Sequence, residues 1–325
     1  MVWAISGGAG FLGVQLARRL LAAGHEVRSL DLIPPDEPQL GVRALRGDIR
    51  DETAARELVT GARILVHTAV ALPTRGARAD IESVNVEGTL TLLSAAAETG
   101  VRRVVFVSSA AVYGVPERLP IEEDDPLAAS GCSGSSTIAA EDVCRAFRRR
   151  GLDCVILRPT TVIGPGRLAP FELLFDRIRE GRRIYTVGKA SNRRQLLAVE
   201  DLVEAIVLSA SRRAAANETL NVGAEAFGTV HSDLQALIAH AGSASRLTPV
   251  PTKPAELTVR ALELARVSPH AEWLTDRDSY TDISKAERIL GWTPRLSNAA
   301  VLTEAYDWYL ANREPKALNP LRKAS

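Results

Sequence analysis

The sequence predicts an α/β protein in which a doubly wound parallel sheet is followed by a smaller C-terminal lobe. Three observations predict this class. Strand and helix patterns alternate through the first half of the chain, which is typical of a parallel sheet covered by helices. A glycine-rich turn separates the first apolar strand from the first amphipathic helix. The regular alternation ends after Pro159, where proline and charged residues become frequent.

The strands are predicted from short apolar runs and the helices from apolar residues that recur every three or four positions. The expected strands are residues 2–6, 26–31, 63–69, 103–108 and 154–158, and the expected helices are residues 11–23, a segment after Asp51, 81–99 and 135–150. Seven such units would build a Rossmann-type sheet with helices on both faces.

The later part of the chain is expected to leave the sheet domain and return to it. We assign residues 1–159 to the Rossmann-type domain, with returns at about 196–224 and 281–297, and residues 160–195 and 225–280 to the lobe. The first return contains a predicted helix at 202–211 and a predicted strand at 219–222. Residues 313–325 are expected to form a loosely held tail.

Composition and charge exclude several classes of protein. The chain has 40 Lys and Arg against 39 Asp and Glu, and the basic residues are scattered, so neither nucleic acid nor an anionic membrane is an expected partner. Cys132, Cys144 and Cys154 lack metal-ligand spacing, which favours reduced thiols in a cytoplasmic protein without a structural metal. An uncharged apolar segment of about twenty residues, which a membrane span requires, is absent from the sequence.

The segment VWAISGGAGFLGVQLARRLLAAG contains a strand, a turn with Gly7, Gly10 and Gly13 in G-x-x-G-x-x-G spacing, and a helix. Glycine lets the backbone approach a pyrophosphate, and the start of the following helix directs N–H groups and a partial positive charge at the phosphates. A turn needed only for helix–strand packing is the alternative. The next strand, however, ends in Asp31, where a carboxylate can accept hydrogen bonds from both hydroxyls of an adenosine ribose.

Asp31 also favours NAD over NADP. Its carboxylate would repel a 2'-phosphate, and the following residues, Leu32 and Ile33, provide no arginine to bind one. NAD is therefore the predicted cofactor.

Several further motifs follow in order: GDIRD, VHTAV, NVEGT, FVSSAAVYG, LRPTTVIGPG and DISKAERILGWTP. With them the chain resembles the extended short-chain dehydrogenase/reductase family, the NAD-dependent epimerases and dehydratases, over nearly its whole length. The resemblance implies a small-molecule substrate in the C-terminal lobe and a homodimer formed through helices 81–99 and 135–150. It implies that NAD is bound by Gly7, Gly10, Phe11, Leu12, Gly13, Asp31, Asp48, Ile49, Thr68, Ala69 and Asn85.

The family's chemistry uses a tyrosine, a lysine four residues later on the same helix face, and a Ser or Thr at a strand end. By this resemblance the strand-end hydroxyl is Ser109, which would also contact the substrate. The segment SGSSTIAAE matches the family's helix motif but has Ser133 in place of the tyrosine and Thr137 in place of the lysine. Tyr113 is no replacement, because the family has this tyrosine as well.

The two substitutions change the expected chemistry. A serine hydroxyl titrates far above a phenol, and Thr137 supplies no ammonium to lower its pKa, so the usual proton exchange is lost at a typical cost of about 100- to 10,000-fold. Three interpretations stay open: a diverged enzyme in which Ser109, Ser133 and Thr137 line the reacting site, a site-inactivated variant of an ordinary sugar epimerase or dehydrogenase, and a non-catalytic NAD-binding module.

Other acids near the motif have structural alternatives. Cys132 adjoins Ser133 but is more typical of a small buried residue. His67 ends the fourth strand, where packing or lining of the cofactor pocket is the better interpretation. The acidic run 122–125 is expected to form a solvated loop.

One arginine is a candidate substrate ligand. Relatives that bind nucleotide sugars clamp the diphosphate with an arginine at the position of Arg194. The aromatic residue and histidine that often follow are Leu196 and Ala198 here, so an apolar alcohol, a steroid-like ligand or a polyketide-type intermediate is an open alternative. A salt bridge from Arg194 to Glu200 or Asp201 is the structural alternative.

Overall fold

The computed structural model describes residues 1–33, 40–71, 78–129, 131–166, 171–250 and 277–313. They contain a seven-stranded sheet in the order β10-β6-β5-β4-β1-β2-β3, and every neighbouring pair is parallel. This confirms the predicted Rossmann-type α/β fold. The strands are β1 (Val2–Ser6), β2 (Glu26–Asp31), β3 (Val42–Arg46), β4 (Ile64–His67), β5 (Arg103–Val107), β6 (Cys154–Pro159) and β10 (Thr219–Val222).

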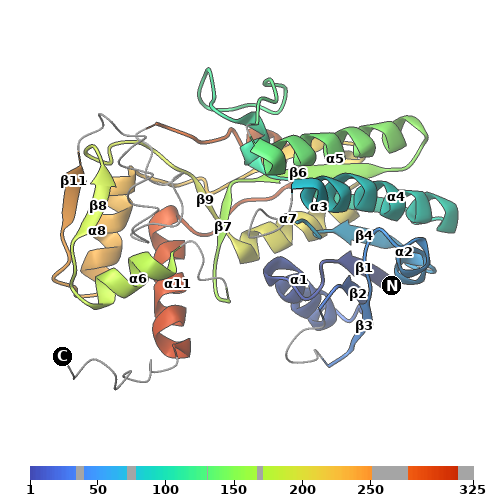
Figure 1. Ribbon diagram of the computed structural model, residues 1–325, viewed down its shortest axis with the longest axis horizontal. Helices are drawn as coiled ribbons and strands as arrows, with labels where there is room; N and C mark the ends of the chain where they lie inside the picture. The colour runs from blue at the N-terminus through green and yellow to red at the C-terminus, as the bar shows by residue number, and fades with distance from the viewer. Residues whose placement is uncertain (34–39, 72–77, 130, 167–170, 251–276, 314–325) are drawn as a thin grey trace.

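Helices cover both faces of the sheet, and successive side chains of a strand point to opposite faces. Trp3 and Ile5 of β1 pack in one core with helices α1 (Phe11–Ala22), α7 (Val199–Ser211) and α10 (Ser284–Leu290). Ala4 packs in the other core, with α2 (Glu52–Val59), α4 (Gly88–Thr99) and α5 (Gly131–Arg149). Figure 1 shows α4 and α5 on one side of the sheet domain and α1 on the other.

Strand β3 is absent from the sequence prediction. It pairs only with β2, and its side chains are exposed or half-buried, because it stands at the sheet edge. Arg43 on this strand forms an exposed salt bridge to Glu57. An edge strand with charged positions lacks the continuous apolar run by which the buried strands are recognised.

The predicted helix 81–99 is interrupted. Helix α3 (Arg78–Glu82) runs into a π-helical turn, η1 (Ser83–Glu87), before α4 begins. Asn85, inside this turn, is buried and hydrogen bonds with the backbone of Ala71 and with Ser136. Such a turn is rare and often occurs at functional sites, and helical periodicity alone does not indicate it.

The lobe lies to the left of the sheet domain in Figure 1. It contains α6 (Glu172–Arg179), α8 (Val230–His240) and the parallel pair β8 (Ile184–Val187) and β11 (Leu247–Val250). A second parallel pair, β7 (Thr161–Ile163) and β9 (Leu196–Ala198), leads into it. The last described helix, α11 (Asn298–Asn312), packs in the lobe core through Tyr306 and Tyr309. The predicted tail lies almost wholly outside the described residues.

Candidate active site

The glycine-rich turn is packed too closely for side chains at several positions, among them Gly7 and Gly13. Gly7 has φ +75°, and a Cβ there would lie 2.8 Å from the Ala69 nitrogen. A Cβ on Gly13 would lie 2.3 Å from the Gly7 carbonyl oxygen, within the packing of α1 against the turn. Gly10 directly precedes α1, and Phe11 and Leu12 form the first turn of that helix. The start of α1 is therefore held at the carboxyl end of β1, where a helix attracts phosphate groups.

The two predicted acids on the adenosine side are both fixed by hydrogen bonds. Asp31, at the end of β2, accepts from the Ala9 N–H at 3.0 Å and from the Ile33 N–H at 3.4 Å. Asp48 forms a salt bridge with Arg50, with 2.6 Å between Arg50 Nη2 and Asp48 Oδ2, and the hydrogen bonds from the Arg50 side chain lower the pKa of Asp48. Arg50 is not among the site residues predicted from the sequence. The neighbouring Ile49 is buried.

Thr68 and Ala69 follow β4 and close the glycine turn from the side. The Thr68 hydroxyl donates to the Ser6 carbonyl at 2.7 Å, and the Thr68 N–H donates to the same oxygen at 3.1 Å. These bonds join the carboxyl ends of β1 and β4. Three groups of predicted cofactor residues, on the ends of β1, β2 and β4, thus meet at one edge of the sheet.

His67 is a core residue with both ring nitrogens in hydrogen bonds. The Thr89 hydroxyl donates to the Asn85 carbonyl at 2.6 Å, so it accepts from His67 Nε2–H at 2.9 Å. His67 Nδ1 then accepts from the Ser6 hydroxyl at 2.7 Å. Burial lowers the pKa of His67 to about 4, because the charged imidazolium would lose its hydration. His67 is therefore neutral near pH 7, in agreement with a packing role.

The buried His67 makes stability depend on pH. The unfolded chain binds a proton near pH 6.5, whereas the folded chain binds it only near pH 4. Stability is therefore expected to fall as pH decreases through this window, by on the order of 3 kcal/mol from this group. Urea unfolding at several pH values should show a smaller loss in His67→Gln than in the wild type. A slope in His67→Gln equal to that of the wild type would contradict the assignment.

Ser133 and Thr137, the residues predicted to stand in place of the family's tyrosine and lysine, lie one turn apart on α5. The hydroxyl of Thr137 donates to the Ser133 carbonyl at 2.9 Å, and the hydroxyl of Ser136 donates to the same oxygen at 2.9 Å. Serine and threonine often bond to a helix carbonyl in this way. Because the Thr137 hydroxyl hydrogen is used inside the helix, Thr137 offers acceptor lone pairs, and not a cationic donor, to its surroundings.

Asn85 connects this part of α5 to the loop after β4. Its Oδ1 accepts from the Ala71 N–H at 2.7 Å, and its Nδ2 donates to the Ser136 hydroxyl at 2.9 Å. Ser136 in turn holds the carbonyl of Ser133. Asn85 thus bonds to protein groups that surround the predicted cofactor site, while a direct contact from Asn85 to NAD stays a prediction.

Ser109 lies just beyond β5, where it begins the 3-10 turn η2 (Ala110–Tyr113). Its side-chain oxygen accepts from the Ala111 N–H at 3.1 Å. Cys132 is half-buried in the first turn of α5, beside Ser133. The hydroxyl residues that the sequence predicted at the reacting site thus come from the end of β5 and the start of α5.

Tyr113 belongs to a buried polar network. Its hydroxyl donates to Asn221 Oδ1 at 2.7 Å and accepts from Arg158 Nη1 at 2.7 Å. Burial raises the pKa of Tyr113 to about 12. Arg158 also binds Glu141, with 2.7 Å between Nη2 and Oε2, and Glu141 accepts from the Ser108 hydroxyl. A buried phenol with a raised pKa and two fixed partners fits a structural role in this network.

Arg194 lies between the two parts of the molecule, just before β9. Its backbone pairs with Ser279 in an isolated parallel bridge, and its side chain is half-buried. The carboxylate of Asp201 accepts from the backbone N–H groups of Arg295 and Leu296, at 3.0 and 3.2 Å.

In the acidic run 122–125, Arg118 pairs with Glu122 and Asp125, whereas Glu123 accepts from the Asn221 N–H.

The residues of the glycine turn fit a dinucleotide. A side chain is excluded at Gly7 and Gly13, α1 begins beside them, and a fixed carboxylate stands at the end of the adjacent strand, as pyrophosphate and ribose require. On α5, Thr137 supplies a neutral hydroxyl and no ammonium group, and its place beside the second ribose stays a prediction.

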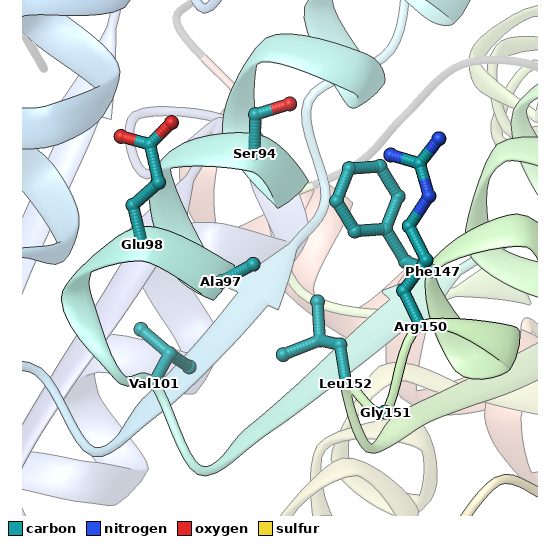
Figure 2. A pocket seen from close by; sticks show the side chains of 8 residues that line it. All are labelled: Ser94, Ala97, Glu98, Val101, Phe147, Arg150, Gly151 and Leu152. Carbon is teal, nitrogen blue, oxygen red and sulfur yellow. The ribbon is translucent and has the colours of Figure 1, made fainter.

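A pocket of about 390 Å³ lies elsewhere, beside the amino ends of β5 and β6, and contains none of the predicted site residues. Figure 2 shows Glu98 and Arg150 on opposite sides of it, with Phe147 and Leu152 between them.

Within the described ranges, His, Cys, Asp and Glu do not gather in a group that could hold a metal. The described helices also include none that is long and apolar enough to cross a membrane.

Comparison with known proteins supports the fold and NAD as the cofactor. The protein y4nG of Sinorhizobium fredii is 35% identical over 313 residues, covering 95% of this chain and 78% of the relative. The UDP-glucose 4-epimerase of Mycolicibacterium smegmatis is 28% identical, covering 94% of this chain and 97% of the relative. The structure of MoeE5 in complex with UDP-glucuronic acid and NAD matches with a TM-score of 0.76 at 26% identity, covering 95% of this chain and 99% of that chain.

The family model described as "NAD dependent epimerase/dehydratase family" matches residues 3–223, from β1 through β10. The matched segment contains the glycine turn, Asp31 and the α5 motif. The chain belongs to the NAD-dependent epimerase/dehydratase family, whose cofactor is NAD.

Proposed function

We propose that this protein is a diverged enzyme of the family that binds NAD and acts on a small-molecule substrate without the usual Tyr/Lys pair. When bound, NAD supplies a hydride acceptor or donor. Ser109, Ser133 and Thr137 line the reacting site as neutral hydrogen-bonding groups. The observation that carries the proposal is the geometry of α5, where the hydroxyl of Thr137 is bonded to the Ser133 carbonyl.

The proposed cofactor contact that can be tested first is the carboxylate of Asp31. In Asp31→Asn the side-chain oxygen can still accept from the Ala9 N–H, but the charge is lost. We expect NAD to bind about tenfold more weakly, because hydrogen bonds from the ribose to a charged acceptor are stronger. The ratio of the affinity for NAD to the affinity for NADP should also fall, because the repulsion of the 2'-phosphate by the carboxylate is removed.

Calorimetric titration of the wild type and of Asp31→Asn with NAD and with NADP measures both effects. Asp142→Asn, at an exposed position on α5, is the control for loss of one negative charge. Unchanged affinities and an unchanged NAD to NADP ratio in Asp31→Asn would reject the role of Asp31.

For the substrate, we propose that Arg194 binds an anionic group such as a diphosphate. The relatives named above support this, since one is a UDP-glucose 4-epimerase and another was solved with UDP-glucuronic acid. Leu196 and Ala198, which follow Arg194, are both buried in β9. Because the names of both relatives refer to UDP-sugars, a nucleotide diphosphate is the first ligand to test. An apolar alcohol is the alternative substrate.

We also propose a cytoplasmic homodimer formed through α4 and α5. Leu90 on α4 is 47% exposed, and it lies on the same helix face as Ser94 and Ala97, which line the pocket in Figure 2. Glu98 and Arg150 carry opposite charges on the two rims, which suits contact with a second copy of the chain related by a two-fold axis.

Leu90→Arg is expected to weaken the dimer at least about tenfold, because an unpaired guanidinium would be buried at the contact. Sedimentation equilibrium of the wild type and the variant measures this change. Leu40→Arg, at a position that is 97% exposed, is the matched control. A dimer of unchanged strength in Leu90→Arg would place the contact elsewhere.

A further inference from the structure

Asn298, the first residue of α11, is fully buried against the segment that carries Arg194. Its Nδ2 donates to the Arg194 carbonyl at 2.5 Å, and its Oδ1 accepts from the Leu196 N–H at 2.8 Å. The side-chain amide therefore bonds to the backbone before and after Gln195, as the backbone of a neighbouring strand would. The backbone around Arg194 is fixed on one side by Ser279 and on the other by Asn298.

A second lobe residue fixes the orientation of this amide. Nδ2 of Asn298 also donates to Asp233 Oδ2 at 2.9 Å. Asp233 lies in α8 and is 5% exposed. An ionised carboxylate only accepts hydrogen bonds, so it requires the NH2 end of the Asn298 amide on its side and leaves the oxygen for Leu196. Every hydrogen-bonding position of the amide nitrogen is then used.

The contacts span three elements that are far apart in the sequence. Asp233 belongs to α8, Asn298 to α11 and Arg194 to the segment before β9, and the two helices pack in the same lobe core. Arg194 itself lies where the chain passes between the lobe and the sheet domain. Buried side-chain amides in such connected networks fix a single arrangement, because a displaced group would be left without its partners.

We propose that Asn298 and Asp233 are positioning residues that set the backbone of Arg194 for binding a diphosphate, a role that rests on the proposed function of Arg194. Neither side chain needs to touch the ligand. Asn298 holds Arg194, and Asp233 holds the amide of Asn298 in the orientation that this requires. A substrate-binding residue is productive only within a narrow range of positions, which buried neighbours of this kind maintain.

The test is calorimetric titration of the NAD-saturated protein with UDP. Arg194→Met is expected to weaken UDP binding by about 10- to 100-fold, as loss of charge-assisted hydrogen bonds does. Asn298→Ala and Asp233→Ala should each weaken it by about tenfold while the Kd for NAD stays unchanged. Asp233→Asn retains an acceptor oxygen and should restore most of the affinity lost in Asp233→Ala. Asn312→Ala, at an exposed position on the same helix, is the matched control.

The outcomes separate the inference from the proposed function. If Arg194→Met weakens UDP binding but Asn298→Ala and Asp233→Ala do not, the positioning role is wrong and the role of Arg194 stands. If Arg194→Met leaves UDP binding unchanged, or the wild type does not bind UDP, the proposed role of Arg194 fails and the inference fails with it. If Asn298→Ala does not fold, as loss of NAD binding would show, Asp233→Ala and its rescue by Asp233→Asn decide the question.

Discussion

Arg158→Met is expected to lower the free energy of unfolding by about 3–5 kcal/mol, because it leaves the buried carboxylate of Glu141 with only the partly exposed Arg145 as an ionic partner among the described residues. Arg158 and Glu141 are 2% and 0% exposed, and two hydrogen bonds join them. Arg158 also donates to Tyr113 and to the Glu123 carbonyl. The substitution therefore disturbs the contacts of α5 with both β5 and β6.

Urea unfolding measures this loss of stability, and two further variants serve as comparisons. Arg43→Met removes one partner of an exposed salt bridge with Glu57, with 62% and 51% exposed side chains, and should cost less than about 1 kcal/mol. The paired change Arg158→Met with Glu141→Leu removes both buried charges and should recover much of the loss. If Arg158→Met lowers the free energy of unfolding no more than Arg43→Met does, the buried network of Arg158 and Glu141 does not contribute the expected stability.

Ser133→Tyr together with Thr137→Lys is expected to reduce the NAD-linked turnover of the wild-type protein by at least about 100-fold. The reason is steric as well as chemical. The segment before α5 packs closely on its first turn, since a Cβ on Gly134 would lie 2.5 Å from the Cβ of Ala129. Under the proposal, a tyrosine ring at position 133 would also take up space in the reacting site that the substrate needs.

The same double variant separates the proposed enzyme from the alternatives. Turnover is followed by nicotinamide absorbance with a panel of small alcohols and by interconversion of UDP-glucose and UDP-galactose. Each single variant is a control, because a tyrosine without the lysine keeps a phenol pKa near 10 and a lysine without the tyrosine lacks the acid. UDP-sugar interconversion that appears only in the double variant would contradict the proposal and indicate an ordinary epimerase with an inactivated site. Turnover in neither the wild type nor any variant would favour a non-catalytic NAD-binding module.

Most of the sheet could be predicted because its buried strands are continuous apolar runs. The exception, β3, is an edge strand whose charged side chains face solvent, so its pairing with β2 depends on tertiary contacts. The π-helical turn η1 has a similar origin. The side chain of Asn85 bonds to Ala71 and Ser136, and these partners are distant in the sequence.

At the site, the sequence predicted residues whose spacing along the chain itself indicates their chemistry. Gly7, Gly13 and Asp31 belong to one local strand–turn–helix–strand pattern, and the structure places them together at the sheet edge. The pairs Arg158–Glu141 and Asn298–Asp233 could not be predicted in this way. Their partners come from separate elements, and each residue type alone is found mostly on protein surfaces.

We propose that this chain binds NAD with Ser133 and Thr137 at the positions where the family's acid–base pair is expected. Calorimetric titration of the purified protein with NAD and NADH, together with analysis of any nucleotide released on denaturation, tests it most directly. We predict saturable binding of NAD, or NAD released from the protein as purified. Absence of both at millimolar NAD would contradict the account and leave the glycine turn with a packing role alone.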